Sequence, residues 1–215
     1  MRSRWTAAVT LAAMWVLALV IYLRAPARVP THWNMRGEID GWGGPASVFI
    51  LPAVAVGIVL MMDILPRVDP RRANWEKFGG EVRLLVNVLV LFLAWMELST
   101  IGAWTFGWKV DGSRTTLAGM GVMLMVLGNY LPRIRSNWWM GIRTPWTLSS
   151  DRVWRETHRL GGRTFVAAGG VSLLAGLLLP APASVSVALA AVAAGSVVPV
   201  VYSYLAWRRE AAGRG

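Results

Sequence analysis

Residues Gly128–Gly162, GNYLPRIRSNWWMGIRTPWTLSSDRVWRETHRLGG, form the longest polar interval in an otherwise apolar sequence. The interval holds six Arg, four Trp and one of the two His of the chain. Arg and Trp are interleaved along it, and both side chains favour the boundary between water and lipid. We therefore expect this segment to lie at a membrane surface.

The rest of the chain has the composition of an integral membrane protein. Its 215 residues are 55% hydrophobic and only 15% charged, whereas soluble domains carry about 25% charge. The apolar blocks are long enough to cross about 30 Å of hydrocarbon as helices. A helix also forms all its backbone hydrogen bonds internally, which lipid requires because it offers no other partner. This predicts an all-α integral membrane fold with six transmembrane helices. The predicted spans are Trp5–Leu23, Val48–Leu65, Leu84–Trp104, Leu117–Leu131, Phe165–Leu179 and Val185–Trp207.

The distribution of positive charge predicts the orientation. Of the 22 Lys and Arg, 17 fall in the two termini and in the second and fourth loops. The positive-inside rule then places both termini and the basic loop 132–164 of this multi-pass membrane protein in the cytoplasm. Because this rule accounts for the net charge of +11 and no nucleic-acid-binding motif accompanies it, direct nucleic-acid binding is not predicted. The absence of Cys excludes disulfides and a thiol nucleophile.

A helix is predicted within the basic loop. Ser150 is a suitable N-cap, Asp151 suits a helix start, and Gly161-Gly162 would end the helix. One face is apolar, and beside it runs a stripe of four arginines: Arg152, Arg155, Arg159 and Arg163. The pattern indicates an amphipathic helix in the membrane interface after span four. It is compatible with anchoring to anionic lipid or with docking of a cytoplasmic partner, and Arg143 is a candidate for holding a phosphate or carboxylate.

The first loop carries a compact polar pattern, Pro30-x-His32-x-Asn34-x-x-Gly37-x-x-Asp40. Asn34 and Asp40 favour Asx-turns and Gly37 permits a positive φ, so a tight turn is expected. A metal held by His32, Glu38 and Asp40 is the alternative, because a catalytic zinc needs three protein ligands. A compact extracytoplasmic turn packed by tryptophans is favoured, and no metal or other cofactor is predicted.

Glu97 is the most costly residue of the chain to bury, because it falls inside span three. A carboxyl at such a position is a candidate functional site. A protonated or hydrogen-bonded carboxyl with a structural role, near the outer end of the span, is the alternative. Catalysis is not predicted, since no phosphate-binding glycine loop or known hydrolase motif is present, although a membrane-embedded enzyme is not excluded.

Two ordered patterns resemble the SdpI family of bacterial membrane proteins. One is the first-loop pattern, with His32, Asn34, Gly37 and Asp40 as toxin-facing candidates. The other runs through the basic segment. Its candidate residues are Asn129, Pro132, Asn137, Gly141, Arg143, Thr144, Pro145, Trp146, Trp154, Thr157 and His158. The resemblance implies a four-span SdpI-like region over residues 66–215, preceded by the first two spans and their motif loop in residues 1–65.

That family includes immunity proteins against a secreted, membrane-active killing peptide. The resemblance therefore implies resistance to such a peptide toxin and, as in the family prototype, a receptor role that recruits a cytoplasmic transcriptional repressor. The implied partners are the lipid bilayer, the toxin and the repressor. From the residues alone, a small-solute or ion-coupled transporter that uses Glu97 is the alternative function.

Overall fold

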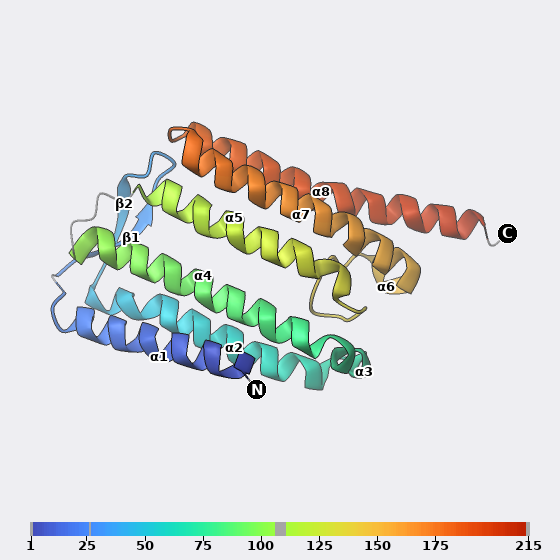
Figure 1. The fold of residues 1–215 in the computed structure, drawn as a ribbon, viewed down its shortest axis with the longest axis horizontal. Helices are drawn as coiled ribbons and strands as arrows, with labels where there is room; N and C mark the ends of the chain where they lie inside the picture. Colours follow the sequence, from blue (N-terminus) through green and yellow to red (C-terminus); the bar gives the residue numbers. More distant parts are fainter. Residues whose placement is uncertain (1, 26, 106–110, 214–215) are drawn as a thin grey trace.

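The computed structural model describes residues 2–25, 27–105 and 111–213. Within these residues six helices are long and apolar enough to cross a membrane, so the all-α, six-span prediction is confirmed (Figure 1). The long helices are α1 (Arg2–Tyr22), α2 (Ile50–Val68), α4 (Gly79–Thr105), α5 (Gly112–Tyr130), α7 (Asp151–Leu178) and α8 (Ala183–Ala212). Most extend beyond the predicted spans because their polar ends continue as helix outside the apolar blocks.

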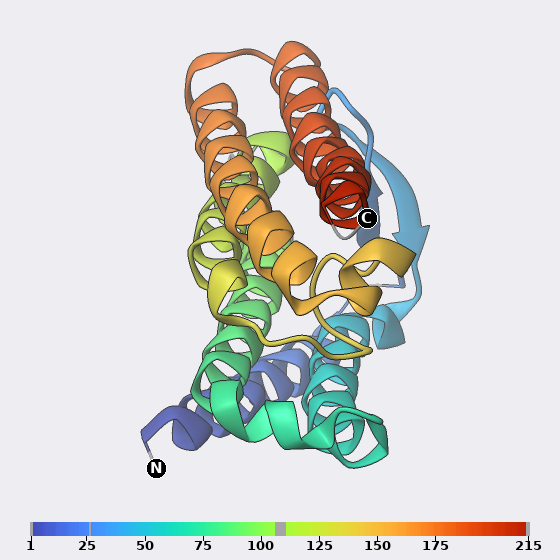
Figure 2. The same cartoon turned by 90° about the vertical axis from the view of Figure 1, so that its right-hand side faces the viewer.

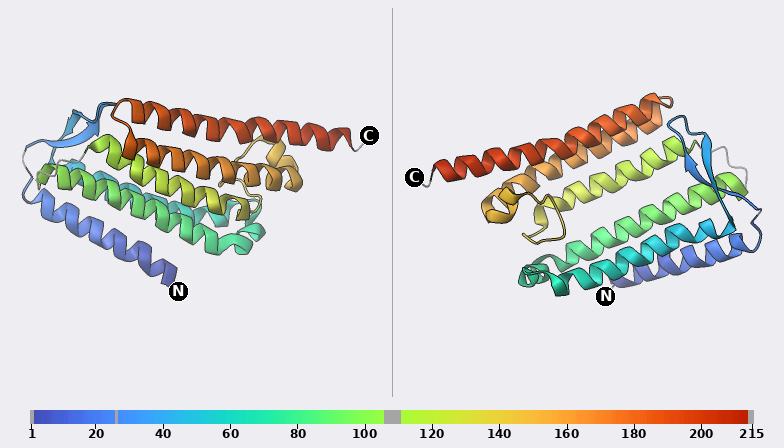
Figure 3. Two further views of the ribbon diagram at one scale, coloured as in Figure 1. Left: turned by 45° about the horizontal axis from the view of Figure 1, so that its top comes forward. Right: turned by 180° about the vertical axis from the view of Figure 1, so that it is seen from behind.

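The short elements gather at the two ends of the bundle. They are β1 (Val29–Trp33), β2 (Ile39–Gly43), η1 (Pro45–Phe49), α3 (Arg72–Trp75), η2 (Glu76–Phe78), η3 (Leu131–Arg133) and α6 (Pro145–Ser149). The antiparallel hairpin of β1 and β2 lies across one end, while α3, α6 and both chain termini lie toward the other (Figures 1 and 3). An even number of spans, with both termini at one end of the bundle, fits the prediction from the Lys and Arg distribution that both termini lie on the same side of the membrane. The assignment of that end to the cytoplasm stays a prediction, and Lys109 and Arg214 of the count lie outside the described residues.

The helices pack in a layered order that Figure 2 shows along the bundle. Helices α7 and α8 lie on one side, α1 and α2 on the other, and α4 and α5 between them. The main apolar core surrounds α4 at the end that carries both termini. It contains Met14, Ala55, Trp75, Phe78, Val82, Leu85, Val86, Val90, Ile134 and Trp154. Trp154 and Ile134 connect this core to the basic loop, so the loop is part of the packed protein.

The α5–α7 contact depends on glycine. A Cβ on Gly121 would lie 2.7 Å from the Gly169 carbonyl oxygen, and one on Gly128 would lie 2.7 Å from that of Gly162. Backbones approach this closely in lipid only where small residues meet. The two glycine pairs therefore fix the spacing and the antiparallel register of α5 and α7.

The prediction of a separate surface helix after span four is wrong. The helix begins at Asp151 as expected, with the Ser150 hydroxyl accepting a hydrogen bond from the Val153 N–H, but it continues without a break to Leu178. Gly161 and Gly162 do not end it, because both are buried against neighbouring segments that have no room for a side chain. Tertiary packing thus overrides the low helix propensity of glycine.

The apolar face of that predicted helix also has a different neighbour from the one expected. That face consists of Val153, Thr157 and Leu160. The first two are buried inside the protein and Leu160 is half-buried, and the neighbouring Trp154 and His158 are buried as well. The arginine stripe is exposed as predicted. The amphipathic pattern was thus identified correctly, but its apolar side packs against the basic loop and α5.

Candidate functional site

The first-loop motif forms the turn of the β1–β2 hairpin. The Asn34 side-chain oxygen accepts hydrogen bonds from the backbone N–H groups of Arg36 at 2.8 Å and Glu38 at 3.1 Å, and Gly37 has φ +77°. The expected Asx-turn at Asn34 and the positive φ of Gly37 are confirmed, whereas Asp40 lies in β2 and its carboxylate pairs with His32. A Cβ on Gly37 would lie 2.9 Å from the Asp111 carboxylate, so this turn sits against the start of α5. Glycine is required there both for its backbone angle and for the close approach.

Of the three side chains proposed as alternative metal ligands, His32, Glu38 and Asp40, only two lie close together. His32 Nδ1 lies 2.5 Å from the Asp40 carboxylate, on side chains that are 70% and 44% exposed. Glu38 instead accepts a hydrogen bond from the Asn34 amide at 3.0 Å. Among the described residues no three His, Asp or Glu side chains converge on a common point. The arrangement therefore favours a polar surface pair on the hairpin and gives no support to a metal centre.

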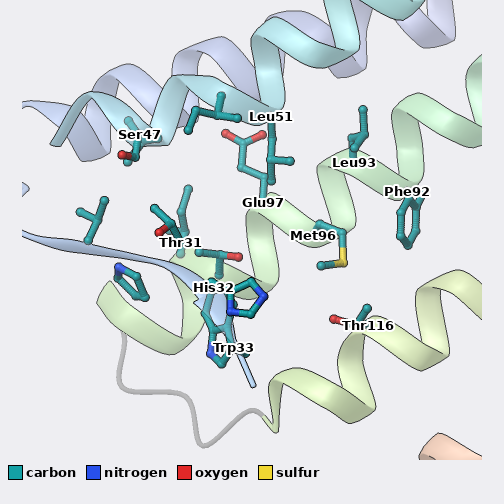
Figure 4. Close-up of a pocket in the computed structure, with 16 residues that line it drawn as sticks. Thr31, His32, Trp33, Ser47, Leu51, Phe92, Leu93, Met96, Glu97 and Thr116 are labelled. Atoms are coloured by element: carbon teal, nitrogen blue, oxygen red, sulfur yellow. The ribbon is translucent and has the colours of Figure 1, made fainter. Parts of the chain in front are cut away.

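A cavity lies beneath the hairpin. It has a volume of about 460 Å³, within the usual range of small-ligand sites. Its walls come from β1, from η1 with the first residues of α2, from the C-terminal half of α4, and from Thr116 of α5 (Figure 4). Most of the lining is apolar. His32 belongs to this lining, so the hairpin motif and the intramembrane cavity form one site.

Glu97 is the acidic group of this cavity. In Figure 4 its side chain extends from α4 toward Leu51 of α2. It is 3% exposed, and neither carboxyl oxygen has a hydrogen-bond partner among the described residues. Buried polar groups in proteins are nearly always hydrogen-bonded. A hydrogen bond to this carboxyl is thus not observed among the described residues, whereas a protonated structural carboxyl stays an alternative to the functional role.

At the opposite end, the motif of the basic loop is tied together by buried polar side chains. Asn137 is fully buried, and its amide group donates to the Arg135 and Met140 carbonyls at 2.9 and 3.1 Å. Its oxygen accepts from the N–H groups of Trp139 and Met140 at 2.8 and 2.6 Å. One side chain thus closes the turn of the loop from inside.

His158 connects the loop to α7. Its Nδ1 lies 2.8 Å from the Trp154 carbonyl, and its Nε2 accepts the Ile142 N–H at 3.0 Å. A carbonyl only accepts and an amide N–H only donates, so the ring is neutral with its proton on Nδ1. Gly141, with φ +99°, lies directly against this ring and leaves no space for a Cβ. His158 therefore has a structural role and is not available as a base or a metal ligand.

Thr144 and Pro145 begin the short helix α6. Thr144 is extended, as expected before proline, and forms a reciprocal capping box with Thr147. Its hydroxyl also lies 3.1 Å from that of Ser203 on α8. The Trp146 ring packs against Tyr204 on the same helix. The motif thus fastens the loop to α8 as well as to α7.

The remaining motif residues divide between the interior and the surface. The Trp154 indole donates to the Ile134 carbonyl at 2.8 Å, and Thr157 is fully buried beside it on α7. Arg143 donates to the Trp138 carbonyl at 2.7 Å but is otherwise exposed. Asn129 and Pro132 line an open groove together with Arg159 and Arg163. The surface of this end is therefore cationic, above a rigid interior.

Asp69 is the residue of this end that sequence reasoning missed. It is 3% exposed, and one of its oxygens accepts both the Trp75 indole N–H at 2.8 Å and the Trp138 N–H at 3.0 Å. The next arginine, Arg71, donates to Ser136 and to the Leu148 carbonyl. The Asp69-Pro70 dipeptide indicated a local turn, which the Arg71 N–H bond to Asp69 forms. Nothing local indicated the bond to the basic loop.

Comparison with known proteins agrees with the two patterns. The model of the SdpI/YfhL protein family matches residues 133–203, and that of a domain of unknown function (DUF1648) matches residues 9–56, which include the hairpin motif. The Bacillus subtilis immunity protein SdpI is 24% identical over 152 residues, covering 71% of this chain and 70% of that protein. An uncharacterized protein of Archaeoglobus fulgidus is 37% identical over 57 residues, covering 25% of this chain and 31% of that one. No solved structure matches. The family resemblance predicted from the sequence is confirmed.

Proposed function

We propose that this chain, a multi-pass bacterial membrane protein of the SdpI/YfhL family, is an immunity protein that protects its cell from a membrane-active peptide toxin. The observation that carries the proposal is the similarity to the B. subtilis immunity protein SdpI over 71% of the chain. The two sequence motifs lie at opposite ends of the bundle, the first in the hairpin and the second in the buried part of the basic segment. The proposed function is not enzymatic.

The two ends of the molecule suit different parts of this function. With the orientation that positive charge predicts, the hairpin and its cavity face the outside, where a secreted toxin arrives. The end with the basic loop then faces the cytoplasm. The hairpin, with His32, Asn34, Gly37 and Asp40, is the proposed toxin-facing surface.

A finer part of the proposal concerns the cytoplasmic end. Seven arginines of the basic segment are exposed there: Arg133, Arg135, Arg143, Arg152, Arg155, Arg159 and Arg163. Three of them lie in the loop that hydrogen bonds of Asn137, His158 and Asp69 hold together, and the other four lie on α7, so the fold sets the backbone positions of all seven. A fixed cationic surface favours an acidic face on a partner through electrostatic complementarity. We propose it as the docking surface for a repressor.

Expression of the chain is expected to protect toxin-sensitive cells. The recipient is a B. subtilis strain without its own SdpI, exposed to the membrane-active peptide against which SdpI protects it and to peptides from other bacteria that carry related immunity proteins. Survival is compared with that of cells expressing B. subtilis SdpI and of cells carrying an empty vector. The protein must be detected in the membrane fraction. Death at the empty-vector rate with every peptide, despite membrane expression, would contradict the proposal.

A transporter is the second candidate function. What favours it is the carboxyl of Glu97 inside a span, which has no hydrogen-bond partner among the described residues. An ion-coupled carrier is expected to change the internal pH of proteoliposomes when a transported solute is added, and Glu97→Gln is expected to abolish that change. An immunity protein without carrier activity gives no solute-dependent change. A flux that persists in the Glu97→Gln variant would remove the reason for assigning transport to this site.

A further inference from the structure

We propose that the cavity beneath the hairpin binds an apolar primary amine, with the ammonium group paired to Glu97. This inference goes beyond the immunity function and does not depend on the identity of any toxin. It assigns a ligand class to a site that lies between β1, α2 and α4.

The first step is the state of Glu97. Both of its oxygens are buried without a hydrogen-bond partner among the described residues. Whether protonated or ionised, a carboxyl in an apolar environment is stabilised strongly by any donor that reaches it. Glu97 is one of the residues that line the cavity, so a donor placed in the cavity lies beside this side chain.

The second step is that no Lys or Arg among the described residues lines this cavity. The one imidazole in the lining, His32, is paired with Asp40 and is largely exposed. Within the part of the chain that the structure describes, Glu97 therefore has no cationic partner, and a ligand can supply one. A bound ammonium would form a charge-assisted hydrogen bond, which is stronger than a neutral one.

The third step concerns the rest of the ligand. Leu51, Leu93 and Met96 give the cavity an apolar wall, and a volume of about 460 Å³ holds a small amphiphile. Trp33 and Phe92 add aromatic rings to the lining, and such rings attract cations. An apolar chain that ends in one ammonium group matches this arrangement. A carboxylate of the same length does not, because it places a like charge beside Glu97.

The test uses the purified full-length protein in nanodiscs of phosphatidylcholine, a lipid without net charge. Octylamine is titrated by calorimetry against wild type and Glu97→Gln, with empty nanodiscs subtracted for partition into lipid. Saturable binding to wild type is expected, with affinity at least about tenfold lower in Glu97→Gln. Octanol and octanoate, which have the same chain length, are expected to bind more weakly than octylamine.

A second acidic residue provides the matched control. Asp63 on α2 is also a carboxyl in a span but lines a different cavity, so Asp63→Asn is expected to bind octylamine as wild type does. Met96→Trp keeps Glu97 but fills the site, and it is expected to weaken binding too. Thermal unfolding of each variant without ligand verifies that it is folded. Equal affinities for octylamine and octanol, or unchanged binding by folded Glu97→Gln, would overturn the proposal.

The source of the amine is addressed by one further arm. A short acetylated peptide whose only amine is a lysine flanked by leucines is titrated in the same way. Binding that depends on Glu97 would show that a peptide side chain supplies the ammonium. Binding of octylamine alone would assign the site to small free amines. If neither ligand binds in a manner that depends on Glu97, the proposal is wrong even where the chain protects cells from a toxin.

Discussion

Replacing Asp69 by alanine is expected to lower the free energy of unfolding by about 3 kcal/mol. The substitution removes the acceptor for the Trp75 indole and for the Trp138 N–H, and each buried donor left without a partner costs about 1 to 3 kcal/mol. The other carboxylate oxygen accepts the Arg71 N–H at 2.7 Å, which shapes the turn after α2. Asp69 thus bonds both this turn and the basic loop.

The effect is measured by reversible unfolding in mixed detergent micelles, followed by circular dichroism. Limited proteolysis of the basic loop is expected to become faster in the same variant, because the loop loses its bond to the α2–α4 connection. Asp69→Asn retains a single acceptor oxygen, so an intermediate loss is expected. Asp151→Ala is the control, since Asp151 is exposed at a helix start and contributes less than about 1 kcal/mol. Equal stability of Asp69→Ala and Asp151→Ala would contradict the structural role of Asp69.

The membrane fold was predictable because hydropathy is a property of local sequence. Each span is an apolar block, and lipid allows such a block little choice besides helix. Local rules also predicted the Asx-turn at Asn34, the positive φ of Gly37, the Ser150 cap and the extended conformation of Thr144. In each case one or two neighbouring residues determine the backbone.

The contacts that hold the basic loop could not be predicted in this way. The bond from Trp138 to Asp69 joins residues 69 positions apart, and that from Arg71 to Leu148 joins residues 77 apart. No periodicity or turn chemistry marks such pairs. The wrong prediction that the helix ends at Gly161-Gly162 has the same origin. It applied a rule about local helix propensity where α5 and the loop pack closely against α7. The burial of His158 against Gly141 likewise depends on how the loop folds back.

Glu97 lies between these two cases. Its position in a span was evident from the sequence, and so was its candidacy as a functional residue. Its lack of a partner and its place beside the hairpin motif required the structure. From the sequence alone, the hairpin and Glu97 were separate features, because His32 and Glu97 are 65 positions apart along the chain. The fold joins them by laying the hairpin across the end of α4.

The neighbouring glycines Gly169 and Gly170 of α7 are expected to respond oppositely to alanine. A Cβ at Gly169 would lie 2.5 Å from the Gly121 carbonyl oxygen and 2.8 Å from the Met125 nitrogen, both backbone atoms of α5. The two helices would have to separate, and overpacking of this kind costs about 1 to 3 kcal/mol. At Gly170 a Cβ meets nothing within 4 Å. Alanine there is expected to stabilise the helix by up to about 1 kcal/mol.

The pair is a sensitive test because the two substitutions are chemically identical and adjacent in one helix. Any difference in the free energy of unfolding, measured by the same detergent titration, therefore arises from the neighbouring helix and not from helix propensity. Gly121→Ala, on the other side of the contact, is expected to behave like Gly169→Ala, since its Cβ would lie 2.7 Å from the Gly169 carbonyl oxygen. If Gly169→Ala and Gly170→Ala were equally stable, α5 and α7 would have to lie farther apart than this structure places them, and the buried position of the loop motif between them would lose its support.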